Sequence, residues 1–255
     1  MVRPATPLKP LAWYKKLATK KGRLAAGAFL VEGDRAITQM MRYDSDAILE
    51  ILATEAYEAA YGQYPLRLLT AGQLRAICHS QTPQGILALM RLPLEVYTHT
   101  LPPSCGPKIL LLEDVQDPGN VGTLIRTAAA FGFSGMILTE KCADPFAPKT
   151  VQATAGSILS LWLRRTPQYL SLAETLKYRG YTFVVADVQG EDEPAVLGQR
   201  ERLLLALGNE AAGLSPALRH AAQARVAIPV ERTEAESLNV ASCGAICMYL
   251  SVQPK

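Results

Sequence analysis

Short apolar runs alternate with segments of helical periodicity along most of the chain. Ile109 to Leu112 is an uninterrupted apolar run, short enough for a strand that is buried on both faces. Turn-forming residues follow it, and from Val121 apolar positions recur at helical spacing until Gly132, which suits the left-handed position after a helix. We expect Asn120 to cap this helix. The pattern predicts strand, loop and helix, with the loop at the strand end where α/β sheets bind ligands.

The same alternation continues to the C-terminus. Apolar runs predict further strands at 136–138, 181–186, 203–207 and 226–228. Segments of helical periodicity predict further helices at 148–155 and 170–179. Ser215 and Pro216 form a cap and a first helical residue, and Ser237 is the expected cap of the last helix. This half is therefore predicted to be an α/β domain around a largely parallel sheet of about five or six strands.

The N-terminal third reads as a second, smaller α/β domain. Strands are predicted at 28–31, 47–53, 66–69 and 86–90, and helices at 35–42, 55–61 and 73–78. A segment with three prolines and a glycine separates the two halves. We therefore expect a first domain over 1–98, a linker over 99–108 and a second domain over 109–255.

The amino-acid composition bears on the cellular location of the protein. Of the 255 residues, 49% are hydrophobic and 19% are charged, which is ordinary for a globular protein. No apolar run approaches the roughly 20 residues of a membrane span, and the N-terminus lacks a signal-peptide core, so we expect a cytoplasmic protein without a membrane partner. The five cysteines contain no C-x-x-C spacing and are interpreted as reduced thiols.

Basic charge is concentrated at one end of the chain. The first 42 residues hold nine Lys or Arg against two acidic residues, whereas the remainder holds 17 against 21. Trp13 and Tyr14 lie within this segment, and basic and aromatic residues together suit RNA. The alternative is a solvated helix face. The predicted RNA contacts are Lys15, Lys16, Lys20, Lys21 and Arg23.

Three segments carry the candidate chemistry: DPGNVGTLIRTAAAFG at 117–132, LGNEAAGLS at 207–215, and IPV with ESLNVAS between 228 and 242. Read alone, each segment is explained about equally well as an ordinary cap, turn or amphipathic helix or as a ligand-binding loop. In this order, however, they closely resemble the three signatures of the SpoU/TrmH branch of the SPOUT RNA methyltransferases, and together they span nearly all of the C-terminal half. The pieces KKGRLAAGAFLVEGDRAI and SQTPQGILAL resemble the substrate-binding domain that many members carry.

The resemblance implies methyl transfer from S-adenosylmethionine to a ribose 2′-hydroxyl of structured RNA, either rRNA or tRNA, by a homodimer. It also implies a C-terminal trefoil knot, which periodicity cannot show. The implied catalytic residues are Asn120, Arg126, Glu210, Ser237 and Asn239. The implied cofactor-binding residues are Leu207, Gly208, Ile228 and Leu238.

Arg126 has two possible roles. The family's chemistry implies a base, but a guanidinium normally stays protonated, so it can instead hold a phosphate and stabilise developing negative charge. No metal site is expected, because the three histidines are far apart and none falls in a signature. Two departures from the family pattern affect the site: Gln152 stands where many relatives carry Arg, and VERTEA at 230–235 makes a longer, more charged loop.

Other classes of function fit less well. A nicotinamide or ATP enzyme needs G-x-G-x-x-G or G-x-x-x-x-G-K-[ST] after a strand, and neither occurs. The remaining alternative is a non-catalytic RNA-binding protein that retains the fold. Such a protein has no need for Asn120, Arg126, Glu210 and Asn239 together, and this combination favours the enzyme.

Overall fold

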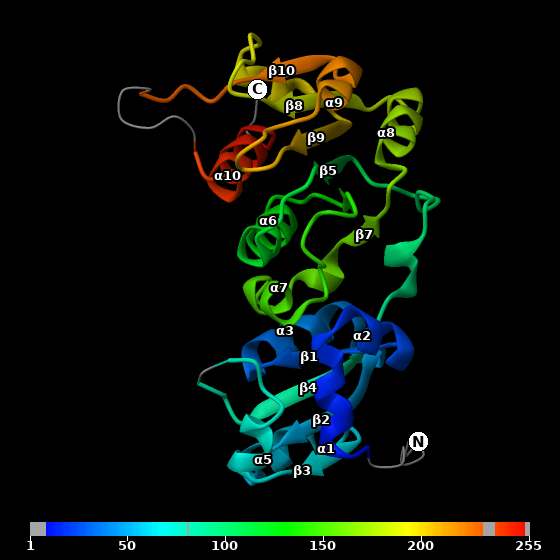
Figure 1. Ribbon diagram of the computed structural model, residues 1–255, viewed down its shortest axis with the longest axis vertical. Coiled ribbons are helices and arrows are strands. Elements are labelled where there is room, and N and C mark those ends of the chain that lie inside the picture. The colour runs from blue at the N-terminus through cyan, green and yellow to red at the C-terminus, as the bar shows by residue number, and fades with distance from the viewer. Residues whose placement is uncertain (1–8, 81, 232–237, 253–255) are drawn as a thin grey trace. The chain divides into compact units, whose positions relative to one another are not determined.

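The computed structural model describes residues 9–80, 82–231 and 238–252 (Figure 1). These residues divide into two compact units. The first combines residues within 1–94 with those of 144–159, and the second combines 95–143 with 160–255. Segment 144–159 thus packs with the N-terminal strands, although the sequence connects it to the second unit. Whether the functional domains divide at 98 and 109 stays a prediction.

The first unit is built on a four-stranded sheet in the order β1-β4-β2-β3. β4 pairs antiparallel with both β1 and β2, and β3 pairs parallel with β2. The strands are β1 Ala28–Glu32, β2 Ile48–Ala53, β3 Leu66–Leu68 and β4 Ile86–Arg91. The helices are α1 Leu11–Lys15, α2 Lys20–Ala26, α3 Asp34–Asp44, α4 Glu58–Tyr61, α5 Ala71–Arg75 and α7 Pro148–Ala153, with 3-10 turns at Lys16–Ala18, Ser45–Ala47, Glu55–Tyr57 and Ile158–Ser160.

Two buried contacts hold segment 144–159 to the first unit. The Phe146 ring packs edge-on against Phe29 of β1 with 4.8 Å between ring centroids. The Arg23 guanidinium of α2 forms an ion pair with Asp144 at 3.1 Å and donates to the carbonyls of Leu17 and Ala18 at 3.0 Å each. Because Arg23 is only 2% exposed, removing one partner of this pair would leave an uncompensated buried charge.

The second unit is built on a six-stranded sheet in the order β10-β8-β9-β5-β6-β7, and every pair in it is parallel. The strands are β5 Lys108–Leu112, β6 Gly135–Leu138, β7 Trp162–Arg165, β8 Thr182–Ala186, β9 Leu203–Leu207 and β10 Ala224–Val226. The helices are α6 Pro118–Ala130, α8 Tyr169–Tyr178, α9 Pro216–Ala221 and α10 Val240–Leu250, with 3-10 turns at Leu94–Tyr97 and Pro194–Gln199. The predicted α/β class and parallel sheet are confirmed.

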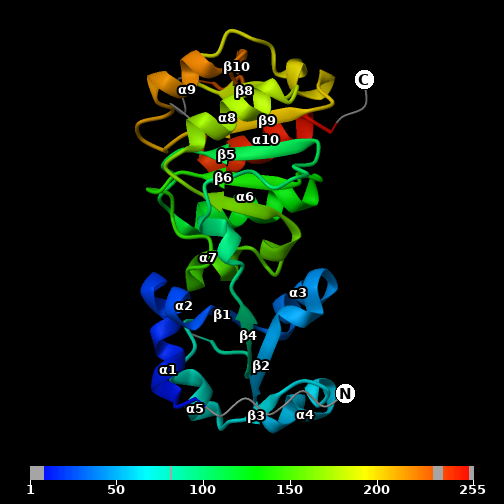
Figure 2. The same cartoon turned by 90° about the vertical axis from the view of Figure 1, so that its right-hand side faces the viewer.

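Helices cover both faces of this sheet, which explains why its strands read as continuous apolar runs. α8 and α9 lie on one face, and α6 and α10 lie on the other (Figure 2). Leu172 and Leu176 of α8 and Leu218 of α9 share a buried cluster with side chains of β5, β6, β8 and β9. On the other face, Gly244 of α10 lets the helix approach Leu124 of α6 and Leu207 of β9, because a Cβ there would overlap both side chains.

Three local predictions were wrong in detail. α6 begins at Pro118, two residues before the expected cap, and Asp117 caps it by accepting from the Asn120 N–H at 2.9 Å. β10 ends at Val226, so Ile228 lies beyond the strand. β7 was missed because WLRR is short and half polar, and its pairing with β6 is visible only in the sheet. The predicted cap Ser215 and the left-handed Gly132 (φ 71°) are confirmed.

Gly135 provides a test of this packing, because it begins β6 directly against the indole of Trp162. We expect Gly135→Ala to lower the free energy of unfolding by about 1–3 kcal/mol, since the added methyl overlaps the ring. Guanidinium unfolding measures this change. Gly72→Ala, at an open helical position, is the control and should be neutral or slightly stabilising. Equal stabilities would contradict the packing described here.

Candidate active site

The candidate active site lies in the second unit, where three loops leave the carboxyl edge of the sheet. One loop joins β5 to α6, one joins β9 to α9, and one joins β10 to α10. β5 and β9 are direct neighbours, with Leu112 opposite Leu207, so their loops leave the sheet side by side. Each of these strand–loop–helix junctions contains one of the three signature segments.

Three predicted side chains from these loops are joined by hydrogen bonds. The Asn239 amide Nδ2 donates to Asn120 Oδ1 at 3.2 Å, and the Asn120 Nδ2 donates to Glu210 Oε1 at 2.8 Å. Glu210 and Asn239 are exposed, and Asn120 is half-buried. We call this chain of three residues the Asn-Asn-Glu relay. It links positions 119 residues apart in sequence and presents amide and carboxylate groups to solvent.

Helix capping fixes the orientation of both asparagines. Asp117 caps α6, which leaves the Asn120 side chain free for the relay. Asn239 caps α10 by accepting from the N–H groups of Ala241 at 2.9 Å and Ser242 at 3.3 Å. The sequence had predicted Ser237 as this cap. Because the Asn239 oxygen is engaged with the helix, its Nδ2 must point away and toward Asn120. Ser237 itself lies outside the described residues.

Asn209 shapes the loop that presents Glu210. Its Oδ1 accepts from the N–H groups of Ala211 and Ala212 at 2.9 Å each, and its Nδ2 donates to the Asp114 carbonyl at 2.8 Å. Gly208 is required because a Cβ there would overlap the Gly213 carbonyl. The glycine therefore serves a close approach within the protein, and its predicted contact with the cofactor stays a prediction.

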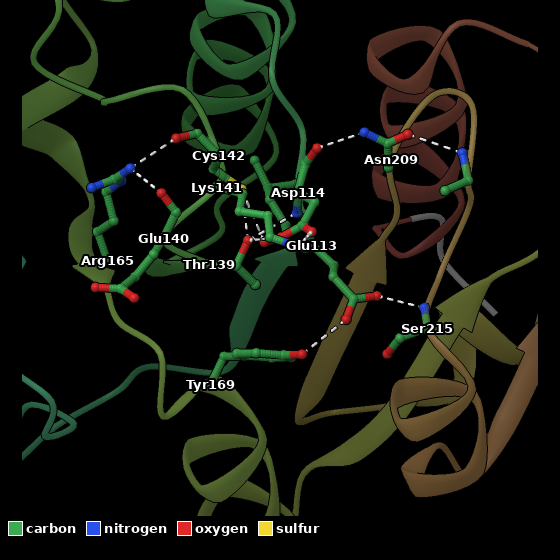
Figure 3. Close-up of polar contacts among 12 residues, drawn as sticks. Glu113, Asp114, Thr139, Glu140, Lys141, Cys142, Arg165, Tyr169, Asn209 and Ser215 are labelled. Atoms are coloured by element: carbon green, nitrogen blue, oxygen red, sulfur yellow. Dashed lines mark hydrogen bonds and ion pairs between the residues drawn. The ribbon is translucent and has the colours of Figure 1, made fainter.

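A polar network supports these loops at the end of β5 (Figure 3). Asp114 has a left-handed backbone (φ 56°), accepts from Thr139 Oγ1 at 2.6 Å and forms an ion pair with Lys141 at 3.2 Å. Glu113, 5% exposed, accepts from Tyr169 Oη at 3.0 Å and from the Ser215 N–H at 2.7 Å. Burial, helped by the Glu113 carboxylate, raises the pKa of Tyr169 to about 12, so this phenol remains a donor at neutral pH.

Arg126 projects from α6 into solvent. It lies six residues after Asn120, so the two Cα atoms are about 9 Å apart along the helix axis. Within the described part of the chain Arg126 forms no hydrogen bond or ion pair. The guanidinium thus keeps its full donor set for a ligand, although the structure does not join it to the relay.

A small apolar cavity lies beside the loop that follows β10. It has a volume of about 80 Å³, and its walls include Val188, Val226, Ile228 and Leu238. Val188 and Leu238 are 55% and 37% exposed, which is unusual for large apolar side chains. Both predicted apolar contacts of the cofactor, Ile228 and Leu238, are therefore brought together. Ligand pockets usually exceed about 300 Å³, so this cavity can hold only part of a cofactor.

The apolar walls fit the adenine of S-adenosylmethionine, because a bound ring would cover the exposed Val188 and Leu238. Asp187 also lines the cavity; its side chain is 2% exposed and pairs with Arg219 at 2.8 Å. Sequence reasoning missed Asp187, although a carboxylate directly after a predicted strand could have indicated it. Leu207 does not line the cavity, since its side chain is buried beside Gly244, so only its backbone could contact a cofactor.

The comparisons with known proteins agree with this geometry. A model of the SpoU rRNA methylase family matches residues 107–249, more than half of the chain. This chain belongs to the SpoU rRNA methylase family. A model of the MRM3-like substrate-binding domain matches residues 13–88. The predicted family, the RNA methyltransferase class and the use of S-adenosylmethionine are therefore confirmed.

Three relatives match along almost their whole length. The 23S rRNA (guanosine(2553)-2′-O)-methyltransferase RlmP of Bacillus subtilis is 32% identical over 92% of this chain and 93% of its own. A TrmH-family structure from Porphyromonas gingivalis is 29% identical with a TM-score of 0.83, covering 96% of this chain and 98% of that chain. The SpoU methyltransferase AviRb of Streptomyces viridochromogenes, in complex with the cofactor AdoMet, is 25% identical with a TM-score of 0.81, covering 95% and 96%.

This chain also carries the basic segment, in its first unit. Lys15, Lys16, Lys20 and Lys21 are exposed, as an RNA-binding surface requires. Arg23 differs, because its buried guanidinium is occupied by Asp144 and two carbonyls and has no exposed face for a phosphate. Tyr14 is also buried and donates to Glu50 at 2.5 Å, so it cannot stack on a base.

Among the described residues, no group of three or more His, Cys, Asp or Glu side chains could hold a metal ion. No helix in the same part of the chain is long and apolar enough to cross a membrane. The five cysteines are all free thiols.

Asn120→Asp tests the relay with a nearly isosteric change. The variant replaces the Nδ2 donor with an oxygen facing Glu210 Oε1, and repulsion of about 1–4 kcal/mol between the carboxylates should open the relay. We expect RNA methylation to fall at least about 10-fold, with little change in melting temperature. Lowering the pH protonates one carboxyl of the pair and restores a donor, so the deficit relative to wild type should shrink. A deficit that does not depend on pH would contradict the relay.

Proposed function

We propose that this chain methylates a ribose 2′-hydroxyl of ribosomal RNA with S-adenosylmethionine. The observation that carries the proposal is the Asn-Asn-Glu relay, which joins all three signature loops at the sheet edge where the β10 loop forms an apolar cavity. RlmP acts on a guanosine of 23S rRNA and the S. viridochromogenes relative on a uridine. Since these two relatives act on different bases, the choice of target base depends on residues other than those that all family members share.

The cofactor supplies a methyl group on a positively charged sulfur, so the reaction is displacement at carbon by the ribose oxygen. The chain's own task is to align that oxygen and to stabilise its developing charge. Ile228 and Leu238 would hold the adenine in the apolar cavity, and the backbone at Leu207 and Gly208 would border the cofactor. Asn120, Glu210 and Asn239 orient the nucleotide, and Ser237 is assigned to the same centre by resemblance.

Arg126 acts in this proposal as an electrostatic group. Its guanidinium remains protonated and binds the phosphate next to the target ribose, and its charge stabilises the oxygen as the proton leaves to water at this exposed edge. The absence of an internal partner for Arg126 among the described residues supports this role, because nothing must be displaced when RNA binds.

The substrate RNA is further held by the four exposed lysines of the first unit. Two departures from the family pattern bear on this binding. Gln152, an exposed residue of α7, offers an amide where many relatives carry a guanidinium. The VERTEA segment lies largely outside the described residues, and its effect on the cofactor or RNA stays a prediction.

Three properties complete the proposal: a homodimer, a C-terminal trefoil knot and a cytoplasmic location. The family membership supports all three, and α10 supports the dimer. Ile246, Tyr249 and Val252 repeat every three residues along α10 and its end and are 37%, 50% and 39% exposed, an apolar stripe that a second copy can cover.

Comparison of ribose methylation in total RNA from cells with and without this protein tests the function. One ribosomal position should lose its methyl group without the protein and regain it on complementation. Unchanged maps, together with no binding of S-adenosylmethionine in calorimetry, would reject the enzyme in favour of an RNA-binding protein.

Arg126→Ala separates cofactor binding from catalysis. We expect nearly unchanged affinity for S-adenosylmethionine, measured by calorimetry, and methylation reduced by about 10²-fold or more, the order found for removing one preorganised electrostatic group. Arg126→Lys should restore little, because a point charge cannot replace the planar fork. Wild-type methylation by Arg126→Ala would disprove the catalytic assignment.

Replacing Lys15, Lys16, Lys20 and Lys21 by Gln tests the basic surface. The RNA concentration for half-maximal rate should rise and the slope of log affinity against log salt should flatten by up to about 3, while turnover at saturation stays similar. Arg75→Gln with Arg91→Gln, exposed in the same unit, is the control for general charge. Arg23→Met should instead lower the melting temperature, because it leaves Asp144 without its buried cation.

Sedimentation tests assembly. At micromolar concentration we expect a dimer, and Ile246→Glu with Tyr249→Glu should yield monomers, because charges on the α10 stripe oppose its burial. Leu94→Glu, at another exposed apolar side chain, is the control and should leave the dimer intact. A monomeric wild type would exclude this assembly.

A further inference from the structure

A second cavity of the catalytic unit lies at the opposite edge of its sheet from the Asn-Asn-Glu relay. It has a volume of about 400 Å³ and is lined by residues 103–107 together with Arg179, Tyr181 and Arg202. Pro107, Tyr181 and Arg202 each directly precede a strand, so the cavity is at the amino ends of β5, β8 and β9. A five-residue strand of about 16 Å separates it from the candidate active site. None of its lining residues falls in a signature segment.

The cavity is positively charged. Over residues 9–80, 82–231 and 238–252, neither Arg179 nor Arg202 forms an ion pair with a carboxylate, and both are exposed. The positive charge of the arginines also affects Tyr181. Burial raises the pKa of its phenol, whereas Arg202 and Arg179 oppose that rise. Two unpaired guanidiniums at one concave site are an arrangement suited to phosphate oxygens.

Internal contacts hold both guanidiniums in place. Arg202 donates to the Arg179 carbonyl at 2.7 Å, and its guanidinium lies over the Tyr181 ring, 5.7 Å from the centroid. Tyr181 donates in turn to the Gly106 carbonyl, and Arg179 donates to Cys105 Sγ at 3.4 Å. Each arginine spends one of its five N–H groups on these contacts. The remaining N–H groups are available to a ligand, and these internal contacts already restrict the conformations of both side chains.

An exposed aromatic residue distinguishes between ligands. Tyr178 directly precedes Arg179 at the end of α8 and is 95% exposed. A small phosphate ligand would not contact an exposed aromatic ring. Proteins that bind single-stranded RNA use arginines to contact its backbone and aromatic side chains to stack on its bases. The two features together favour RNA.

We propose that Arg179, Arg202 and Tyr178 form a second RNA-binding site, which holds a single-stranded segment of the substrate away from the methylated nucleotide. Arg179 and Arg202 bind backbone phosphate in the cavity, and Tyr178 stacks on a neighbouring base. The inference rests on the proposed function for the identity of the RNA. It adds a contact on the catalytic unit that is separate from both the relay and the N-terminal lysines.

The test uses the full chain and two probes: a fluorescent oligouridylate of about 12 nucleotides, followed by anisotropy, and pyrophosphate, followed by calorimetry. Arg179→Gln with Arg202→Gln should raise the oligouridylate Kd about 10-fold and reduce the salt slope by about 1.4, the loss of two phosphate contacts on a single strand. Tyr178→Ala should weaken oligouridylate and leave pyrophosphate binding unchanged. Arg200→Gln, an exposed arginine of the same segment, is the matched control and should change neither.

Two outcomes would overturn the proposal. If the double variant binds oligouridylate as the Arg200→Gln control does, the cavity is not an RNA site. If the double variant loses only pyrophosphate binding and Tyr178→Ala has no effect, the cavity binds a small phosphate ligand instead. Failure of the proposed function is distinguishable, because wild type would then bind oligouridylate with the predicted variant pattern and yet methylate no RNA.

Discussion

The parallel pairing of β5 with β9 is the constraint on which the rest of the catalytic unit depends. Its register sets Leu112 opposite Leu207, and the two strands therefore release their loops at the same level. Asn209 then bonds to the Asp114 carbonyl across the two loops, and Glu210 is presented to Asn120. A slip of one residue would invert the faces of β9 and remove Glu210 from the relay.

Around this pairing, side chains are divided between holding the loops and offering groups to ligands. Glu113, Asp114, Asp117 and Asn209 spend their oxygens on backbone N–H groups or on neighbouring side chains, so they are structural. Because these side chains hold the loops, the amides of Asn120 and Asn239, the Glu210 carboxylate and the Arg126 guanidinium remain accessible to ligands from solvent. Each hydrogen bond contributes only about 1 kcal/mol to stability, but the set fixes the orientation on which methyl transfer depends.

Charge is divided in a similar way. Arg23 and Asp144 face each other inside the first unit, where the loss of either partner would leave a buried charge uncompensated. The exposed lysines nearby, Arg126 on α6, and Arg179 with Arg202 at the far edge of the catalytic sheet keep guanidinium or ammonium groups available to solvent. Long-range attraction of RNA needs such exposed positive groups.

The sequence by itself determined the alternation of strands and helices, because burial on both faces of a parallel sheet imposes continuous apolar runs such as 109–112 and 203–207. It also identified the residues of the relay, since their motifs are local. Tertiary structure decided what local pattern cannot encode. Whether Asn120 caps α6 or reaches Glu210 depends on Asp117 taking the cap, and whether Arg23 meets solvent or Asp144 depends on where segment 144–159 packs. The Arg179 and Arg202 cavity is likewise invisible in sequence, because it forms only where three strand starts meet.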